Sequence, residues 1–160
     1  MLLDILRERL IYEPDTGLFR YRYDFNVMRA GDAAGRPNTN GHIQISINSK
    51  RYMAHNLAWL YMTSIYPDFI VDHKNRIYSD NSWNNLRRAT LSENMGNSKL
   101  SKINTSGLKG VYWHKTKKKW VAQIGLKNKR VYLGSFTEKE KAQEAYRNAA
   151  AEYFGDFANV

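Results

Sequence analysis

Three runs rich in aromatic and β-branched residues, separated by short polar stretches, dominate the last third of the chain. They read GVYWH from residue 110, KWVAQIGL from residue 119 and RVYLGSF from residue 130. Strands joined by connections this short must run antiparallel, so we predict a three-stranded antiparallel sheet. Ala142, Ala145 and Ala149 then recur on one face of a helix, and their small side chains let it pack closely on the sheet. An α+β fold is therefore expected here.

A compact β-β-α unit is predicted upstream, in residues 70–98. A β-prone segment leads directly into Asp72 and His73, a polar loop follows, and a short second strand can return. Thr90 and Glu93 then have the spacing of a capping box that starts a helix. A second capping box is predicted downstream, at Thr137 and Glu140.

The residues that precede this unit predict a helix and a β-hairpin. Leucines recur at helical spacing over residues 2–10, isoleucines alternate with polar residues in the expected hairpin at 43–53, and residues 55–66 form an apolar helix candidate. The segment SKLSKINTSG has little to bury, so we expect a linker there. The predicted domains are 1–98 and 108–160, with the linker at 99–107.

The composition favours a polyanionic partner. The net charge is +10, and the absence of cysteine excludes disulfides and thiolate zinc fingers. No apolar run approaches the roughly 20 residues that span a bilayer. Asp4 and Glu8 also interrupt the segment where a secretory signal would be apolar. We therefore expect a cytoplasmic protein that binds nucleic acid, with no membrane partner and no organic cofactor.

Asp72, His73 and Asn94 are the groups that phosphodiester cleavage requires. A neutral imidazole can accept a proton from water, and carboxylate and amide oxygens suit Mg²⁺ first and Mn²⁺ second, rather than zinc. An isolated Asp-His pair at a strand end is more often a hydrogen-bonded turn. The spacing of the whole segment therefore distinguishes a metal site from such a turn.

The segment VDHKN, followed by SDNSWNNLRRATLSEN, resembles the HNH endonucleases. With the preceding hairpin and AHNLAWLYM, it is similar to the free-standing and intron-associated HNH nucleases of phages over most of residues 10–98. The resemblance implies a ββα-metal fold in which His73 is the general base, Asp72 and Asn94 hold one divalent ion, and Asn85 fixes the loop that orients His73. Asn94 stands where many members have His, which favours Mg²⁺.

We also make predictions for five further residues near the motif. Arg87 and Arg88 are candidates to hold the phosphate. His55, at the start of an apolar helix, is expected to pack or cap rather than to bind a metal. We expect Trp59 and Trp83 to belong to the core.

The C-terminal sheet presents positive charge on every strand. Eight Lys or Arg residues and no acidic residue lie between Lys109 and Arg130. Strand alternation predicts a helix-covered face formed by Val111, Trp113, Trp120, Ala122, Ile124, Val131 and Leu133. It predicts an outer face with Tyr112, His114, Val121, Gln123, Arg130 and Tyr132. A sheet can enter the major groove of DNA while surrounding lysines contact phosphates, and the lysines expected to do so are Lys117, Lys118 and Lys119.

Residues 107–157 resemble the Apetala type of DNA-binding domain, known from plant ethylene-response factors and also found attached to HNH nucleases. Arg130 stands where that family uses Arg on DNA, and Tyr132 stands where it often has Trp. Arginines of the plant pattern are replaced by Tyr112, His114 and Gly125. The resemblance implies double-stranded DNA as the partner and a target sequence different from that of the plant proteins.

Together these features predict a metal-dependent DNA endonuclease of HNH homing type, phage-encoded and active in a bacterial host, which nicks DNA or cuts both strands as a monomer or homodimer. A DNA-binding regulator that no longer cuts is the alternative. RNA binding is a weaker one, because the A-form major groove is too narrow for a sheet.

Overall fold

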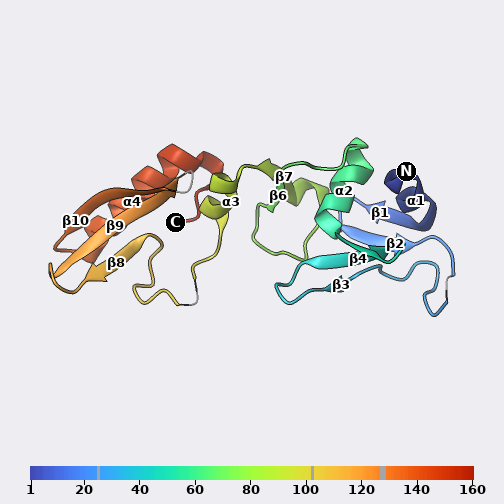
Figure 1. Cartoon of the computed structure of the whole chain (residues 1–160), viewed down its shortest axis with the longest axis horizontal. Helices are drawn as coiled ribbons and strands as arrows, with labels where there is room; N and C mark the ends of the chain where they lie inside the picture. The colour runs from blue at the N-terminus through green and yellow to red at the C-terminus, as the bar shows by residue number, and fades with distance from the viewer. Residues whose placement is uncertain (25, 102, 127–128) are drawn as a thin grey trace. The chain divides into compact units, whose positions relative to one another are not determined.

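The fold is α+β and comprises two compact units, Met1–Arg88 and Ala89–Val160 (Figure 1). In this computed structural model the chain is described over residues 1–24, 26–101, 103–126 and 129–160. Residue 102 of the predicted linker lies outside the described residues. The domain bounds proposed from the sequence stay a prediction.

The first unit begins with helix α1 (Leu2–Arg9), as predicted, and continues into an antiparallel hairpin that was not predicted. The hairpin pairs β1 (Leu10–Glu13) with β2 (Leu18–Tyr21). Gly17 closes the turn with φ +72, and a β carbon there would collide with the backbone of Asn81. Because glycine has no β carbon, this turn can lie against the backbone of the loop that contains Asn81.

A second sheet of the first unit has the order β3-β4-β5, with strands β3 (Arg36–Pro37), β4 (Ile43–Ile47) and β5 (Lys50–Met53). The predicted hairpin of β4 and β5 is confirmed. Helix α2 (Ala54–Thr63) follows at once and ends at Ser64, whose left-handed φ of 62 stops it before the predicted end at residue 66.

The Asp-His segment forms strand β6 (Ile70–His73), which pairs with β7 (Leu86–Ala89). A short 3-10 helix, η1 (Trp83–Asn85), closes the loop between them. Trp59 and Trp83 pack against the core of this unit with their ring centroids 5.1 Å apart, which confirms their prediction as core residues. The fully buried members of that core include Leu6, Phe19, Ile45 and Leu57.

Helix α3 (Leu91–Asn97) opens the second unit. The predicted capping box is present: the Thr90 hydroxyl accepts from the backbone N–H of Glu93, and the Thr90 N–H donates to the Glu93 carboxylate at 2.7 Å. Asn94 lies one turn inside the helix, as predicted.

The predicted three-stranded antiparallel sheet is confirmed. Its order is β10-β9-β8, with strands β8 (Val111–His114), β9 (Lys119–Leu126) and β10 (Lys129–Phe136). Helix α4 (Lys139–Phe154) covers one face of the sheet and η2 (Gly155–Phe157) ends it (Figure 1).

The second predicted capping box is wrong. Glu138 is the N-cap of α4 and makes no side-chain capping bond, so Thr137 lies outside the helix. The helix begins late enough for Lys139 to place its ammonium group over the Trp120 ring, 5.4 Å from the centroid.

The predicted division of the sheet into two faces is mostly confirmed. Val111, Ala122 and Ile124 are buried beneath α4. Trp113, expected on the same face, is 44% exposed and packs on Trp120 with the ring centroids 5.2 Å apart. Val121, expected to face outward, is 4% exposed.

Candidate functional site

Asp72 and His73 end strand β6 with their side chains buried at 5% and 2% exposure. The pairing of β6 with β7 brings Arg87 beside them, and its Nε lies 2.9 Å from the Asp72 carboxylate. The Arg87 side chain is itself only 15% exposed. A charge-assisted hydrogen bond in such a buried setting fixes the Asp72 carboxylate in one orientation.

The His73 ring is oriented by Asn81. Its Nε2 lies 3.1 Å from Oδ1 of Asn81, whose amide Nδ2 donates to the carbonyl of Ser79. The amide oxygen therefore faces the imidazole and can accept a hydrogen bond from Nε2 when that nitrogen carries the ring proton. Asn81 was not predicted as a site residue, because the segment holds many asparagines and only the folded loop distinguishes this one.

The surroundings of His73 favour its neutral form. Burial lowers the pKa of His73, while Asn81 and the charges of Asp72 and Asp80 offset part of that shift. The net effect is a lower pKa of His73. His73 is therefore neutral at physiological pH, as a group that must accept a proton requires.

Asn85 closes the loop between β6 and β7. Its Oδ1 accepts from the N–H of Asn75 at 2.9 Å, and its Nδ2 donates to the carbonyl of Asp80 at 2.7 Å. Its backbone carbonyl also accepts from the N–H of Lys74. One buried side chain thus fixes both arms of the loop that carries Asn81, which supports the expectation that Asn85 acts by holding the loop.

The two arginines of β7 have different surroundings. Arg87 is engaged by Asp72, whereas the Arg88 guanidinium lies over the Phe69 ring, 4.4 Å from its centroid, and is exposed. Arg88 is thus the more accessible of the two residues predicted to hold the phosphate. Their roles stay predictions.

Three histidines converge at the same place. His42, which precedes β4, His55 on α2 and His73 each offer a ring nitrogen, and these atoms all lie within 4.8 Å of one another. Nδ1 of His55 is buried with no hydrogen-bond partner among the described residues. Burial lowers the pKa of His55 to about 3. The cluster is therefore neutral and could hold a metal ion.

Neither His42 nor a shared site for His55 was predicted. The β4–β5 hairpin separates His42 from His55, and most of α2 with the segment up to β6 separates His55 from His73, with no fixed ligand spacing. His42 is further held by Tyr78, whose ring stacks on it at 4.3 Å with an interplanar angle of 9°.

Asn94, the other predicted metal ligand, is half-buried on α3. It belongs to the second unit whereas Asp72 belongs to the first, so their joint binding of one ion stays a prediction. Carboxylate and amide oxygens remain the donor set that suits Mg²⁺ or Mn²⁺.

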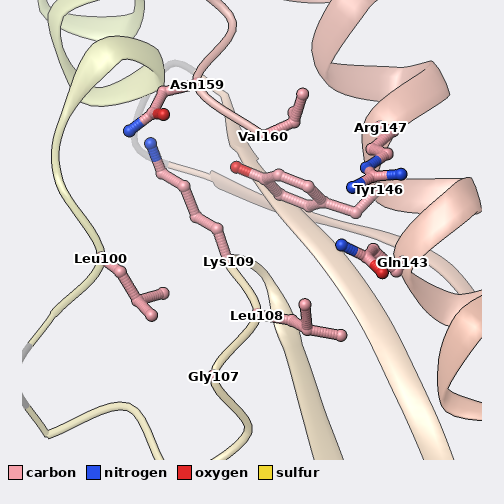
Figure 2. A pocket seen from close by; sticks show the side chains of 9 residues that line it. All are labelled: Leu100, Gly107, Leu108, Lys109, Gln143, Tyr146, Arg147, Asn159 and Val160. Carbon is pink, nitrogen blue, oxygen red and sulfur yellow. The ribbon is translucent and has the colours of Figure 1, made fainter.

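The C-terminal end of α3 is held by two residues from elsewhere in its own unit, Lys109 and Asn159. The Lys109 ammonium group lies 3.1, 2.6 and 2.8 Å from the carbonyl oxygens of Met95, Gly96 and Ser98, and Asn159 donates its amide to Ser98. Figure 2 shows the polar ends of Lys109 and Asn159 pointing toward this yellow-green helix beside a pocket of about 320 Å³.

The outer face of the sheet brings the predicted DNA-contacting side chains together. Cross-strand pairing places Tyr132 opposite Gln123 and Arg130 opposite Gly125, and directly paired residues share a face. Tyr112 and Tyr132 are 40% and 62% exposed. The remaining predicted residues lie at the β8–β9 turn, where Lys117, Lys118 and Lys119 are exposed and His114 is half-buried.

Within the described parts of the chain, no helix is both long enough and apolar enough to cross a membrane.

Two family models match the chain. A model of the HNH endonucleases matches residues 52–96, which include all the predicted catalytic and metal-binding residues. A model of the AP2 domain matches residues 106–156, which include all the predicted DNA-contacting residues. Protein 3.8 of Escherichia phage T7 is 33% identical over 90 residues, which are 56% of this chain and 74% of that protein.

Proposed function

The chain belongs to the HNH endonuclease family and ends in an AP2 domain, and from this premise we propose that it is a metal-dependent DNA endonuclease of the homing type. The AP2 domain would place the nuclease on a preferred duplex sequence. The observation that carries the proposal is the buried, neutral His73 held by Asn81 beside the fixed carboxylate of Asp72.

His73 is the general base in this proposal. Its neutral imidazole would take a proton from the attacking water, and Asn81 would stabilise the resulting imidazolium by accepting from Nε2. Asn85 acts through the loop and keeps Asn81 at the ring. His73 is buried, so bulk water has little access to the imidazole, and the proton would come from a water held at the phosphate.

Asp72 and Asn94 would hold the divalent ion, Mg²⁺ first and Mn²⁺ second, since both offer the hard oxygen donors that these ions prefer. When bound, the ion would offset the negative charge that develops on the phosphate and the leaving oxygen. Arg87 keeps the Asp72 carboxylate in place, and Arg88, which is exposed on β7, would pair with a phosphate.

The alternative is a regulator that binds DNA without cutting it. The basic outer face of the AP2 sheet supports this second function, because contacts from Lys and Arg to duplex DNA need no divalent ion. Metal dependence of cleavage separates the two functions.

The proposal is tested with supercoiled plasmid and the purified full chain, in Mg²⁺ or in EDTA, alongside His73→Ala. Metal-dependent relaxation or linearisation that His73→Ala loses, while it still retards DNA in a gel, is the expected result. Cleavage by His73→Ala at the wild-type rate would remove His73 from the mechanism. If the wild type retards DNA but cuts neither the plasmid nor a random-sequence library, the regulator is the correct function.

One active site per chain predicts the form of the product. A monomer would nick one strand, and a double-strand break would require two chains or two sequential events. The similarity to a phage T7 protein supports a phage origin and action inside a bacterial host.

A further inference from the structure

Three of the four histidines in this cysteine-free chain meet in the first unit, and their ring nitrogens lie within 4.8 Å of one another. They come from three separate places in the fold: the residue before β4, the first turn of α2 and the end of β6. Only His73 has a role in the proposed reaction. The other two have no catalytic assignment.

The spacing of the cluster suits a transition-metal ion. Three atoms within 4.8 Å of one another lie at most about 2.8 Å from a common centre, and Zn–N bonds measure about 2.0–2.1 Å. Each nitrogen thus needs to move inward by at most about 0.8 Å, which small ring rotations supply. Three imidazoles with an open fourth position are a familiar zinc ligand set.

The hydrogen bonding around the rings also suits a metal. A metal-binding histidine usually donates its other N–H to a fixed acceptor, and Asn81 Oδ1 is such an acceptor for His73 Nε2. Nδ1 of His55 is buried without a partner among the described residues, although burying such an atom unpaired costs stability. The stack of Tyr78 on His42 restricts the third ring.

We propose that His42, His55 and His73 form a second metal site, specific for transition-metal ions such as Zn²⁺ or Co²⁺. It is distinct from the oxygen-donor site of Asp72 and Asn94. Neutral imidazoles favour these ions over Mg²⁺, which prefers oxygen ligands.

Occupation of this site switches the nuclease off, an effect that rests on the proposed role of His73. An ion bound to the His73 ring would compete with the proton that this ring is proposed to accept from water. Zn²⁺ would therefore inhibit cleavage even in excess Mg²⁺, and chelation of Zn²⁺ would restore it.

Binding is tested first, without DNA or Mg²⁺, by titrating the full chain with Co²⁺ and recording the visible spectrum. Tetrahedral Co²⁺ absorbs far more strongly than the hydrated ion, and with no cysteine present the signal reports nitrogen and oxygen ligands only. One equivalent should bind with a tetrahedral spectrum. His42→Ala, at a half-buried position, should weaken binding by more than the roughly 10–100-fold that an outer partner contributes.

His114→Ala is the matched control, because the fourth histidine lies on β8 in the other unit and should leave the spectrum unchanged. Circular dichroism and thermal unfolding establish that each variant is folded, and a destabilised His42→Ala is replaced by His42→Gln. A wild-type spectrum that stays that of hydrated Co²⁺, or equal binding by folded His42 variants, would overturn the proposal.

Inhibition is tested second, as the ratio of Mg²⁺-dependent cleavage rates with and without Zn²⁺ within each variant. Zn²⁺ should suppress the wild type and His114→Ala strongly, and the His42 variant weakly. Equal suppression of all three would overturn the inhibitory role. A wild type that never cuts in Mg²⁺ would refute the proposed nuclease, while the Co²⁺ spectrum would still decide the metal site.

Discussion

The ammonium group of Lys109, in the AP2 domain, donates to the backbone carbonyl of Gly96, the last residue that the HNH model matches, at 2.6 Å. The last carbonyls of a helix lack partners within it, and a cation near them also interacts favourably with the helix dipole. The AP2 domain therefore completes the helix that carries Asn94, in addition to any contact that it makes with DNA.

Lys109→Met should weaken this helix while keeping the aliphatic stem. Hydrogen bonds from a charged donor contribute about 1.5–3 kcal/mol. Because two of the three bonds are solvent-exposed and therefore weakened by water, we expect a total loss of only about 1–2 kcal/mol in the free energy of unfolding. The Mg²⁺ concentration for half-maximal cleavage should rise, because Asn94 is held less firmly. Denaturant unfolding and a Mg²⁺ titration of the cleavage rate measure the two effects.

Lys115→Met is the control for this prediction. Lys115 lies exposed at the β8–β9 turn, so its replacement removes the same charge without touching α3. Equal changes in the Mg²⁺ requirement of both variants would show that Lys109 acts only through net charge.

The pH dependence of cleavage should follow His73. A general base works in its neutral form, and burial lowers the pKa of His73 below the reference 6.5. As the pH decreases, the single-turnover rate should therefore remain constant past pH 6.5 and fall only at a still lower pH. Asn81→Asp, which puts a negative charge beside the ring, should move the fall to higher pH. A wild-type midpoint above 6.5 would contradict the assignment.

His55 should make the fold sensitive to acid. Burial lowers its pKa from 6.5 to about 3, so between these values the unfolded chain binds a proton that the folded chain does not. The contribution of His55 to the free energy of unfolding is then fully present above about pH 6.5, and it decreases as the pH falls toward 3. At about pH 5 the expected loss from His55 is about 2 kcal/mol.

Urea unfolding in EDTA at neutral and mildly acidic pH measures this effect. His55→Gln removes the titrating group and should flatten the dependence by about the same amount. The prediction fails if the folded variant loses as much stability on acidification as the wild type.

Substitutions in the AP2 sheet should distinguish a residue that gives sequence preference from one that gives general affinity for DNA. Arg130→Ala should reduce discrimination between a selected duplex and a scrambled one by about 1–3 kcal/mol, as expected for the loss of a base contact. Lys118→Ala should weaken binding to both duplexes alike and reduce the salt slope by about one. Binding curves at several salt concentrations check both. An Arg130→Ala variant that loses affinity equally for both duplexes would make Arg130 a phosphate contact.

The sequence by itself determined most of the helices and strands and the place of the Asp-His motif at a strand end. Alternating β-prone runs with short turns leave little freedom except an antiparallel sheet, and the Thr90 capping box is a local hydrogen-bond pattern, so both were predictable. Asp72 and His73 were also found at the predicted strand end, because strand and motif lie within a few residues.

Only the tertiary structure decided which distant side chains meet. Asn81 was one of several loop asparagines until the loop closed on His73, and His42 lies 31 positions before His73 with no spacing that marks it as a neighbour. Lys109 could not be distinguished from the other lysines of its segment until α3 packed near it. Such contacts depend on how elements pack, whereas periodicity and capping depend on residues near in sequence.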